Sequence, residues 1–112
     1  MSGEWIENFS GAVTVCDREG IILEMNRKAC DTFAKYGGKD LIGKNLFDCH
    51  PEPARSKLKT MMEERRTNVY TIEKNGVKKI IHQSPWYKDG DYQGFVELSL
   101  EIPFEMPHHV RQ

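Results

Sequence analysis

The chain has 112 residues, with 16 Lys and Arg against 17 Asp and Glu, so its formal net charge is −1 at pH 7. A chain of this length builds one hydrophobic core, and without a basic excess it lacks the main source of nucleic-acid affinity, so we expect no direct nucleic-acid binding. No apolar run approaches the roughly 20 residues of a membrane-spanning helix, and the N-terminus lacks a signal-peptide pattern, so we also expect no membrane contact.

The first 26 residues predict a short helix followed by a β-hairpin. Within residues 1–10, Trp5 and Phe9 lie at i and i+4, so they share one face of a short flanking helix. Two apolar runs, 12–17 and 20–25, then surround the polar turn Asp17-Arg18-Glu19-Gly20. Asp and Gly supply the turn chemistry and the Val and Ile residues supply strand propensity, which together predict a hairpin.

The middle of the chain predicts helices. Asn26 is a good N-cap for a helix over residues 27–36, which Gly37-Gly38 would end. Pro51 stands where the first turn of a longer helix is expected, because an apolar stripe at i, i+4, i+7 and i+8 follows. This stripe consists of Ala54, Leu58, Met61 and Met62.

Beyond Thr67 the hydrophobic period changes to two, which predicts strands over 69–73, 77–87 and 92–102. Asn75-Gly76 and Asp89-Gly90 join them and are strong hairpin signals. In the last strand one face carries Val96, Leu98 and Leu100, and the other carries Phe95, Glu97 and Ser99. The order of elements predicts an α+β fold in which one five-stranded antiparallel sheet has its helices packed on one face.

Four short motifs occur in an order that resembles a PAS domain, a small sensor fold. They are Asp17-Arg18-Glu19-Gly20, Asn26, the turn Leu41-Ile42-Gly43-Lys44, and the segment from Asp89-Gly90 to Gly94. The resemblance covers about residues 10–102 and implies that the last strand lies centrally beside the first. We therefore divide the chain into an N-terminal flanking helix (1–10), a PAS domain (11–102) and a C-terminal tail (103–112), in which Pro103 and Pro107 block a continuous signalling helix.

The resemblance implies a standalone sensory module without catalysis, in which an apolar pocket between helices and sheet binds an unknown small ligand. Signalling would proceed through contacts with a separate effector protein, with regulation of transcription as one candidate output. The residues expected to line the pocket are Leu23, Met25, Phe33, Leu58, Met61, Met62, Ile72, Val96 and Leu98. The alternative is a dimerisation domain whose core is filled.

A second alternative arises from Asp48-Cys49-His50-Pro51, which we place at the N-terminus of the longest helix. The helix dipole there favours a thiolate, so Cys49 is a candidate redox thiol, and His50 is a candidate axial ligand, as haem-binding PAS domains use a His from this helix. The simpler interpretation is that both residues only flank the helix start. Light-sensing flavin domains carry a Cys directly after Gly-x-Asn; here Leu46 follows Gly43-Lys44-Asn45, so we expect no flavin adduct.

The cysteines and the N-terminal aromatic residues lead to three further expectations. Cys16, Cys30 and Cys49 are odd in number and widely spaced, which favours a reducing, cytoplasmic location, and without CxxC or HxxxH spacing we expect no metal site.

The N-terminal helix is too short to be stable alone, so it needs a surface to pack on. We expect a homodimer through that helix and the sheet face away from the other helices; the alternative is a monomer in which the segment covers its own sheet. The residues expected at the interface are Trp5, Ile6, Phe9, Ile81, Tyr87 and Phe95.

Overall fold

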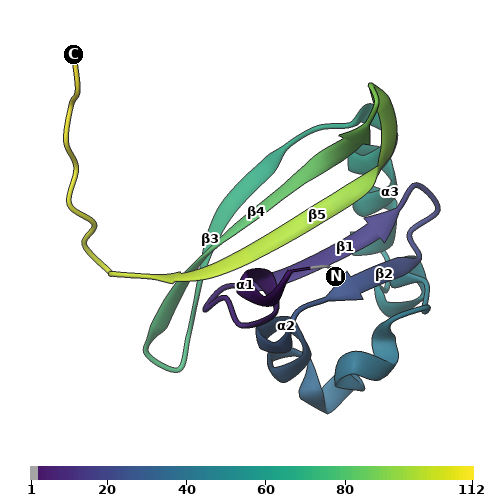
Figure 1. Cartoon of the computed structure of the whole chain (residues 1–112), viewed down its shortest axis with the longest axis horizontal. Coiled ribbons are helices and arrows are strands. Elements are labelled where there is room, and N and C mark those ends of the chain that lie inside the picture. The colour runs from purple at the N-terminus through teal and green to yellow at the C-terminus, as the bar shows by residue number, and fades with distance from the viewer. Residues whose placement is uncertain (1–2) are drawn as a thin grey trace.

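The computed structural model describes residues 3–112 and contains a five-stranded antiparallel sheet in the order β2-β1-β5-β4-β3 (Figure 1). The strands are β1 (Ala12–Asp17), β2 (Ile22–Met25), β3 (Asn68–Lys74), β4 (Val77–Lys88) and β5 (Asp91–Ile102). The last strand lies in the middle, beside the first. Both the predicted antiparallel sheet and its central last strand are confirmed.

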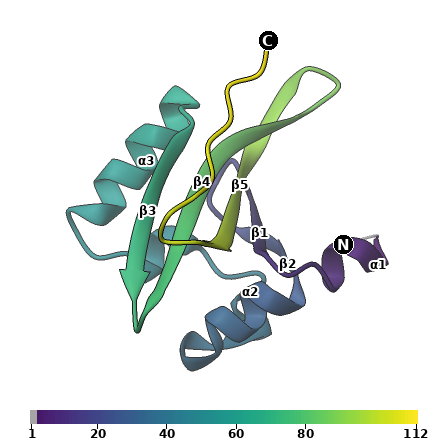
Figure 2. The ribbon, with the colours of Figure 1, turned by 90° about the vertical axis from the view of Figure 1, so that its left-hand side faces the viewer.

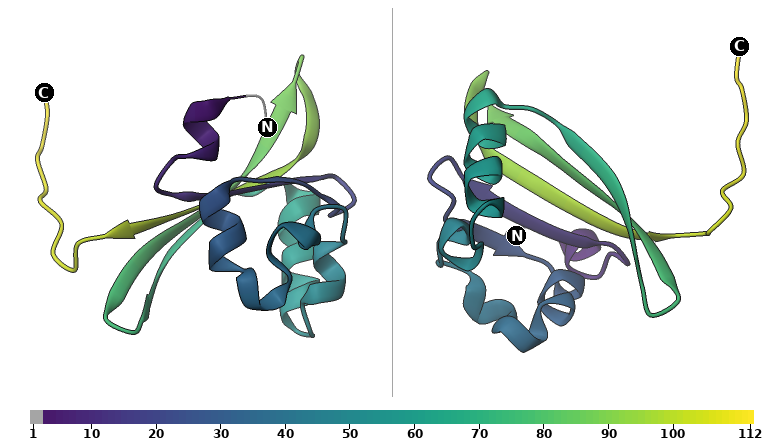
Figure 3. Two further views of the ribbon diagram at one scale, coloured as in Figure 1. Left: turned by 60° about the horizontal axis from the view of Figure 1, so that its bottom comes forward. Right: turned by 180° about the vertical axis from the view of Figure 1, so that it is seen from behind.

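The helical elements are distributed unequally over the two faces of the sheet. They are α1 (Glu4–Glu7), α2 (Arg27–Thr32), α3 (Ala54–Glu64) and the 3-10 turns η1 (Ala34–Tyr36), η2 (Gly38–Leu41) and η3 (Leu46–Cys49). Figures 2 and 3 show α2, α3 and the segment between them on one side of the sheet and α1 on the other. We call these sides the helix face and the outer face. Within residues 3–112 no helix is both long and apolar enough to span a bilayer.

Asn26 joins four segments of the chain and is the only polar side chain among the fully buried residues described. Its Oδ1 accepts hydrogen bonds from the backbone N–H of Val13 (2.9 Å) and Ala29 (3.0 Å). Its Nδ2 donates to the carbonyls of Ile6 and Gly11, both at 2.9 Å. One amide therefore caps α2, holds β1 beside the end of β2, and fastens α1 to the sheet.

The hairpin turn is held by a carboxylate and by packing. Asp17 Oδ1 accepts from the N–H groups of Glu19 and Ile21, both at 2.9 Å. Gly20 has φ +86°, and a Cβ there would lie 2.6 Å from the Phe47 ring, so only Gly fits. Strand β2 begins at Ile22, two residues later than predicted.

Two helix boundaries differ from the prediction. The expected helix over 27–36 divides into α2 and η1 at Phe33, whose φ and ψ of −104° and 22° are not helical. The long helix begins at Ala54 rather than at Pro51. Pro53 explains this start, because the residue before a proline is disfavoured in the α conformation and the helix cannot run through Glu52.

The two faces of β5 are assigned the opposite way to the prediction. Phe95 lies on the helix face, where it is 5% exposed and packs with Cys16, Met61 and Met62. The alternation of the strand then places Val96, Leu98 and Leu100 on the outer face. The outward row is wholly apolar, whereas the inward row combines Phe95 with the polar Glu97 and Ser99, so hydrophobicity alone favoured the wrong face.

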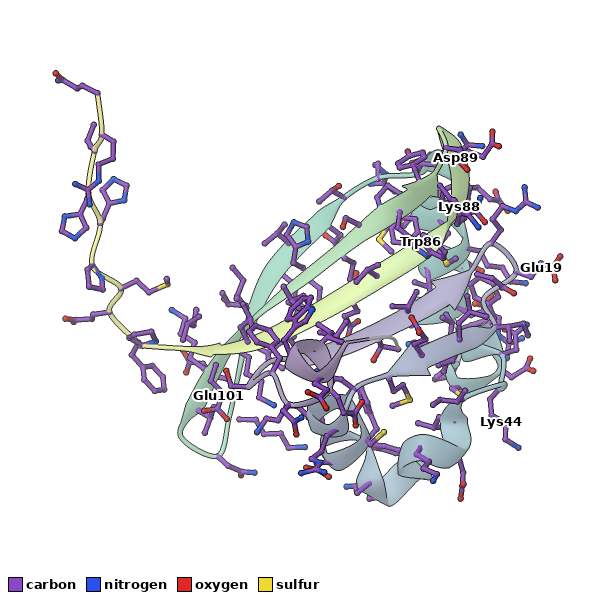
Figure 4. The ribbon with its side chains drawn as sticks, in the orientation of Figure 1. Glu19, Lys44, Trp86, Lys88, Asp89 and Glu101 are labelled. Atoms are coloured by element: carbon purple, nitrogen blue, oxygen red, sulfur yellow. The ribbon has the colours of Figure 1, made fainter. Side chains whose placement is uncertain are left out.

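On the outer face, strands β4, β5 and β1 approach one another closely at Gly94. Gly94 has φ +147°, and a Cβ there would overlap the carbonyl oxygen of Cys16. Trp86, which is paired with Gly94, donates from Nε1 to that same oxygen (3.1 Å) and so reaches from β4 across β5 to β1 (Figure 4). Any larger residue at position 94 would separate β5 from β1.

We expect Asn26→Ala to lower the free energy of unfolding by about 3–5 kcal/mol, because it leaves several buried backbone groups without partners. Urea denaturation followed by circular dichroism measures this. The control is Asn8→Ala, which removes one exposed hydrogen bond to Glu4 and should cost less than about 0.5 kcal/mol. Equal, small losses in both variants would contradict the role given to Asn26.

Candidate ligand-binding site

The helix face of the sheet and the helical elements over it enclose a cavity of about 560 Å³. This volume is within the range of small-molecule sites, roughly 300–1,000 Å³. The residues that line it are Thr14, Cys16, Ile22, Phe33, Tyr36, Leu41, Leu46, Cys49, His50, Leu58, Met61, Met62, Gln83, Phe95, Val96 and Glu97. Most of this wall is apolar, and its polar groups include the neighbouring side chains of Gln83 and Glu97.

Five of the nine residues predicted for the pocket lie on this lining: Phe33, Leu58, Met61, Met62 and Val96. Val96 borders the cavity although the alternation of β5 turns its side chain to the outer face. The other four lie elsewhere. Met25 is buried in a neighbouring cluster with Ala12, Ile22 and Ala29. Leu23 is 41% exposed. The register of β1 and β2 shifts beside it, between Val15 and Cys16, so the strict alternation of inward and outward side chains is interrupted there.

Strand geometry explains why the remaining two residues lie outside the pocket. Ile72 is 42% exposed because it lies on the edge strand β3, away from the helices. Leu98 lies on the outer face because β5 faces the opposite way to the prediction. Hydrophobicity could not have indicated the positions of Ile72 and Leu98, since both side chains are as apolar as those that line the cavity.

The C-terminal end of α3 is fastened to β5 above this cavity. The hydroxyl of Tyr92 donates to the carbonyl of Met62 (3.1 Å), and the Arg65 guanidinium lies 4.6 Å from the centre of the Tyr92 ring. Tyr92 in turn packs edge-on against Phe95, with ring centroids 6.3 Å apart. These contacts hold Met61 and Met62, whose flexible side chains suit a wall that adapts to its occupant.

Three polar side chains form a hydrogen-bonded row across the helix face. Asn68 Nδ2 donates to Gln83 Oε1 (3.1 Å), and Gln83 Nε2 donates to Glu97 Oε2 (2.8 Å). Burial, and secondarily the negative charge of Glu97, raise the pKa of Tyr70 beside this row. Sequence reasoning missed Gln83 and Glu97 as site residues; they would have been found had Phe95 been taken as inward, since Glu97 shares its side of β5.

His50 borders the cavity in a defined tautomer. Its Nδ1 lies 2.6 Å from the carbonyl oxygen of Leu46, which can only accept, so Nδ1 carries the hydrogen. In the neutral ring, Nε2 then keeps a lone pair that can bind a metal or accept a hydrogen bond. Arg55 Nε donates to the His50 carbonyl (3.2 Å) and holds this backbone in place.

Cys49 does not lie at the N-terminus of the long helix as predicted. It is the last residue of η3, five positions before Ala54, so the α3 dipole does not act on its thiol. The thiol is exposed, borders the cavity and lies 3.8 Å from the Asn45 carbonyl oxygen. The dipole argument for a redox-active Cys49 was therefore wrong.

The predicted interface residues separate into two groups. Ile81 and Phe95 are buried at 6% and 5% exposure, on the helix face, so they cannot meet a partner on the outer face. Tyr87 is exposed, but packs beside Tyr92, which also lies on the helix face. Trp5, Ile6 and Phe9 do lie on the outer side with α1, and Trp5 is 73% exposed.

The amino-acid sequence matches the family described as PAS domain over residues 10–100. The chain therefore belongs to the PAS domain family, a class of sensory and signal-transduction modules. A search of curated proteins found no match.

Several solved structures share the fold. A C-terminal domain from Streptococcus mutans is 19% identical, with 86% of this chain and 78% of that chain covered and a TM-score of 0.70. The Aer2 receptor from Vibrio cholerae, described as a dual PAS-heme oxygen sensor, is 17% identical, with 83% and 95% covered and a TM-score of 0.66. The PAS domain of BvgS from Bordetella pertussis is 17% identical, with 88% and 81% covered and a TM-score of 0.65. At these identities the likeness concerns the fold.

The three thiols should differ in reactivity towards iodoacetamide at pH 8. Burial raises the pKa of Cys16, which lowers its thiolate fraction, and the side chain is only 3% exposed. We expect Cys49 to be alkylated first and Cys16 last, with rates that differ by more than about tenfold. Peptide mass spectrometry over time measures the order, and Cys49→Ser should remove the fastest site. Equal rates at Cys16 and Cys49 would contradict the burial described.

Proposed function

We propose that this PAS domain binds a small, largely apolar ligand in the cavity and signals through the outer face to a separate effector protein, without catalysis of its own. The supporting observation is the cavity itself, whose size suits a small molecule and whose wall includes two methionines. The free cysteines agree with a cytoplasmic location. Regulation of transcription is one candidate output of the effector.

The mechanism we propose is a shift in population. Strand β5 presents Phe95 and Glu97 to the cavity and, by alternation, Leu98 and Leu100 to the outer face, so one backbone serves both surfaces. A ligand that prefers one arrangement of this strand increases the fraction of molecules that adopt it. The partner then meets a different distribution of outer-face conformations.

We also propose a homodimer through α1 and the outer face. The apolar side chains available there are Trp5, Ile6 and Phe9 of α1 with Val15, Ile80, Val96, Leu98 and Leu100 of the sheet. Each is exposed or only partly buried in the single chain, so together they offer apolar surface for an interface. Because Asn26 ties α1 to its own sheet, the helix would be a fixed part of that interface rather than an exchanged arm.

Leu58→Trp should abolish ligand binding, because it places a larger ring in the cavity. A ligand present at about 100 times its dissociation constant stabilises the folded state by about 2.7 kcal/mol. We expect wild type to carry a small molecule that mass spectrometry detects after denaturation, with higher thermal stability before its removal than after. Leu98→Trp, the same change on the outer face, is the matched control and should retain the molecule.

If wild type and both variants carry nothing, and cell extract stabilises none of them, the ligand proposal is wrong. The chain would then be a dimerisation domain with a filled core.

Trp5→Glu should weaken self-association at least about tenfold, because it places a charge in the apolar interface while leaving the backbone contact of Ile6 with Asn26 intact. Sedimentation equilibrium at increasing concentration measures the dissociation constant. Ile42→Glu is the control, because Ile42 is exposed and lies in the segment between α2 and α3; it should leave the dissociation constant unchanged. A wild type that stays monomeric at high micromolar concentration would exclude the homodimer.

Haem is a second candidate ligand, because the hydrogen bond from His50 Nδ1 to Leu46 leaves Nε2 available as an axial ligand. Against it, the described lining contains no Lys or Arg that could pair with the haem propionates. An absorbance spectrum of freshly purified protein separates the two candidates. The apolar-ligand proposal expects no Soret band; a Soret band that His50→Ala removes would favour haem.

A further inference from the structure

Glu97 carries the one carboxylate on the lining that residues 3–112 form. Its Oε2 accepts a hydrogen bond from Gln83, and the Gln83 carbonyl oxygen is already occupied by Asn68. The second carboxylate oxygen, Oε1, takes no part in this row. Across the sheet, Glu97 is paired with Thr14, which also borders the cavity.

The surroundings of Glu97 contain no compensating positive charge. Within residues 3–112 no Lys or Arg forms an ion pair with this carboxylate, and the cavity lining contains neither residue type. Its neighbours Thr14, Tyr70 and Gln83 are all neutral groups. Gln83 is therefore the described hydrogen-bond donor to this partly buried carboxylate, and the charge itself has no partner among the described residues.

The other polar group of known orientation in the cavity is also an acceptor. His50 donates from Nδ1 to Leu46, so in the neutral ring the remaining nitrogen, Nε2, offers a lone pair. Gln83 uses both its oxygen and one of its N–H groups within the row. The unused capacity of Glu97 and of His50 is that of acceptors, which a ligand can meet with donors. The hydroxyls of Thr14 and Tyr36 and the second N–H of Gln83 can donate, but they are neutral, so Glu97 is the group on the described lining that favours a charged donor.

We propose that the ligand of this cavity is a cation, a protonated amine or amidine on an apolar body, whose N–H groups donate to the Glu97 carboxylate. The apolar part lies against Met61, Met62 and Phe95, and the charged nitrogen lies at the row formed with Gln83. This inference rests on the proposed function, because it specifies the chemistry of the ligand that the cavity is proposed to bind. A charge-assisted hydrogen bond is about twice as strong as a neutral one, so charge should dominate the choice among ligands of equal shape.

Three probes of matched shape test the proposal: 2-(2-naphthyl)ethylamine, 2-(2-naphthyl)ethanol and 3-(2-naphthyl)propanoate. Binding at pH 7 is followed by the methyl resonances of Met61 and Met62, which border the cavity. The variant is Glu97→Gln, whose amide oxygen still accepts from Gln83, so the row and the fold are retained. Glu101→Gln is the control, because Glu101 lies on the same strand but is exposed and outside the cavity (Figure 4).

We expect wild type and Glu101→Gln to bind the amine about tenfold more tightly than the alcohol, and the propanoate most weakly. Glu97→Gln should bind amine and alcohol equally. An amine preference that persists in Glu97→Gln, or the absence of any preference in wild type, would overturn the inference while leaving a ligand-binding cavity in place. If none of the three probes shows saturable binding, the cavity proposal fails, and this inference fails with it.

Discussion

The hydrogen bonds of Asn26 are the interaction on which the other elements depend. One buried amide satisfies two backbone N–H groups and two carbonyls from segments that are far apart in sequence. Because all four bonds need both an acceptor and a donor on one short side chain, neither Asp nor Leu can replace it. The helix face and the outer face are both positioned from this point, since the same residue begins α2 and fastens α1.

The cavity results from how the helical segment crosses the sheet. Between α2 and α3 the chain forms 3-10 turns rather than a long helix, and its backbone at Gly43, Lys44 and Leu46 bonds to the hairpin. The helix α3 instead approaches β5 through Tyr92. Met61 and Met62 pack on Cys16 and Phe95 between these two attachments, and the cavity lies beside that cluster.

Much of the fold follows from local sequence signals, because the Asn-Gly and Asp-Gly turns and the Asn26 cap act over a few residues. Local signals do not decide which row of β5 faces the helices, since Val96 and Leu98 are as apolar as Phe95. Packing against α3 decides it. The pairing of Gln83 with Glu97 depends on the register shift between Trp86 and Tyr87, because the Asp89-Gly90 turn alone would place Gln83 opposite Val96. Four pocket residues, Phe33 and the stripe residues Leu58, Met61 and Met62, were placed correctly because their helices carry their own periodic pattern.

The contact at Gly94 makes the two ends of the sheet mechanically different. Trp86 and the Cys16 carbonyl hold β4, β5 and β1 together at that end, without room for even a methyl group between the strands. At the opposite end β4 and β5 extend beyond the helices, and the C-terminal residues leave from there (Figure 1). Bending of the sheet would have a fixed point near Gly94 and its greatest amplitude near Ile102, so a small displacement beside the cavity would be enlarged where the chain continues towards its C-terminus.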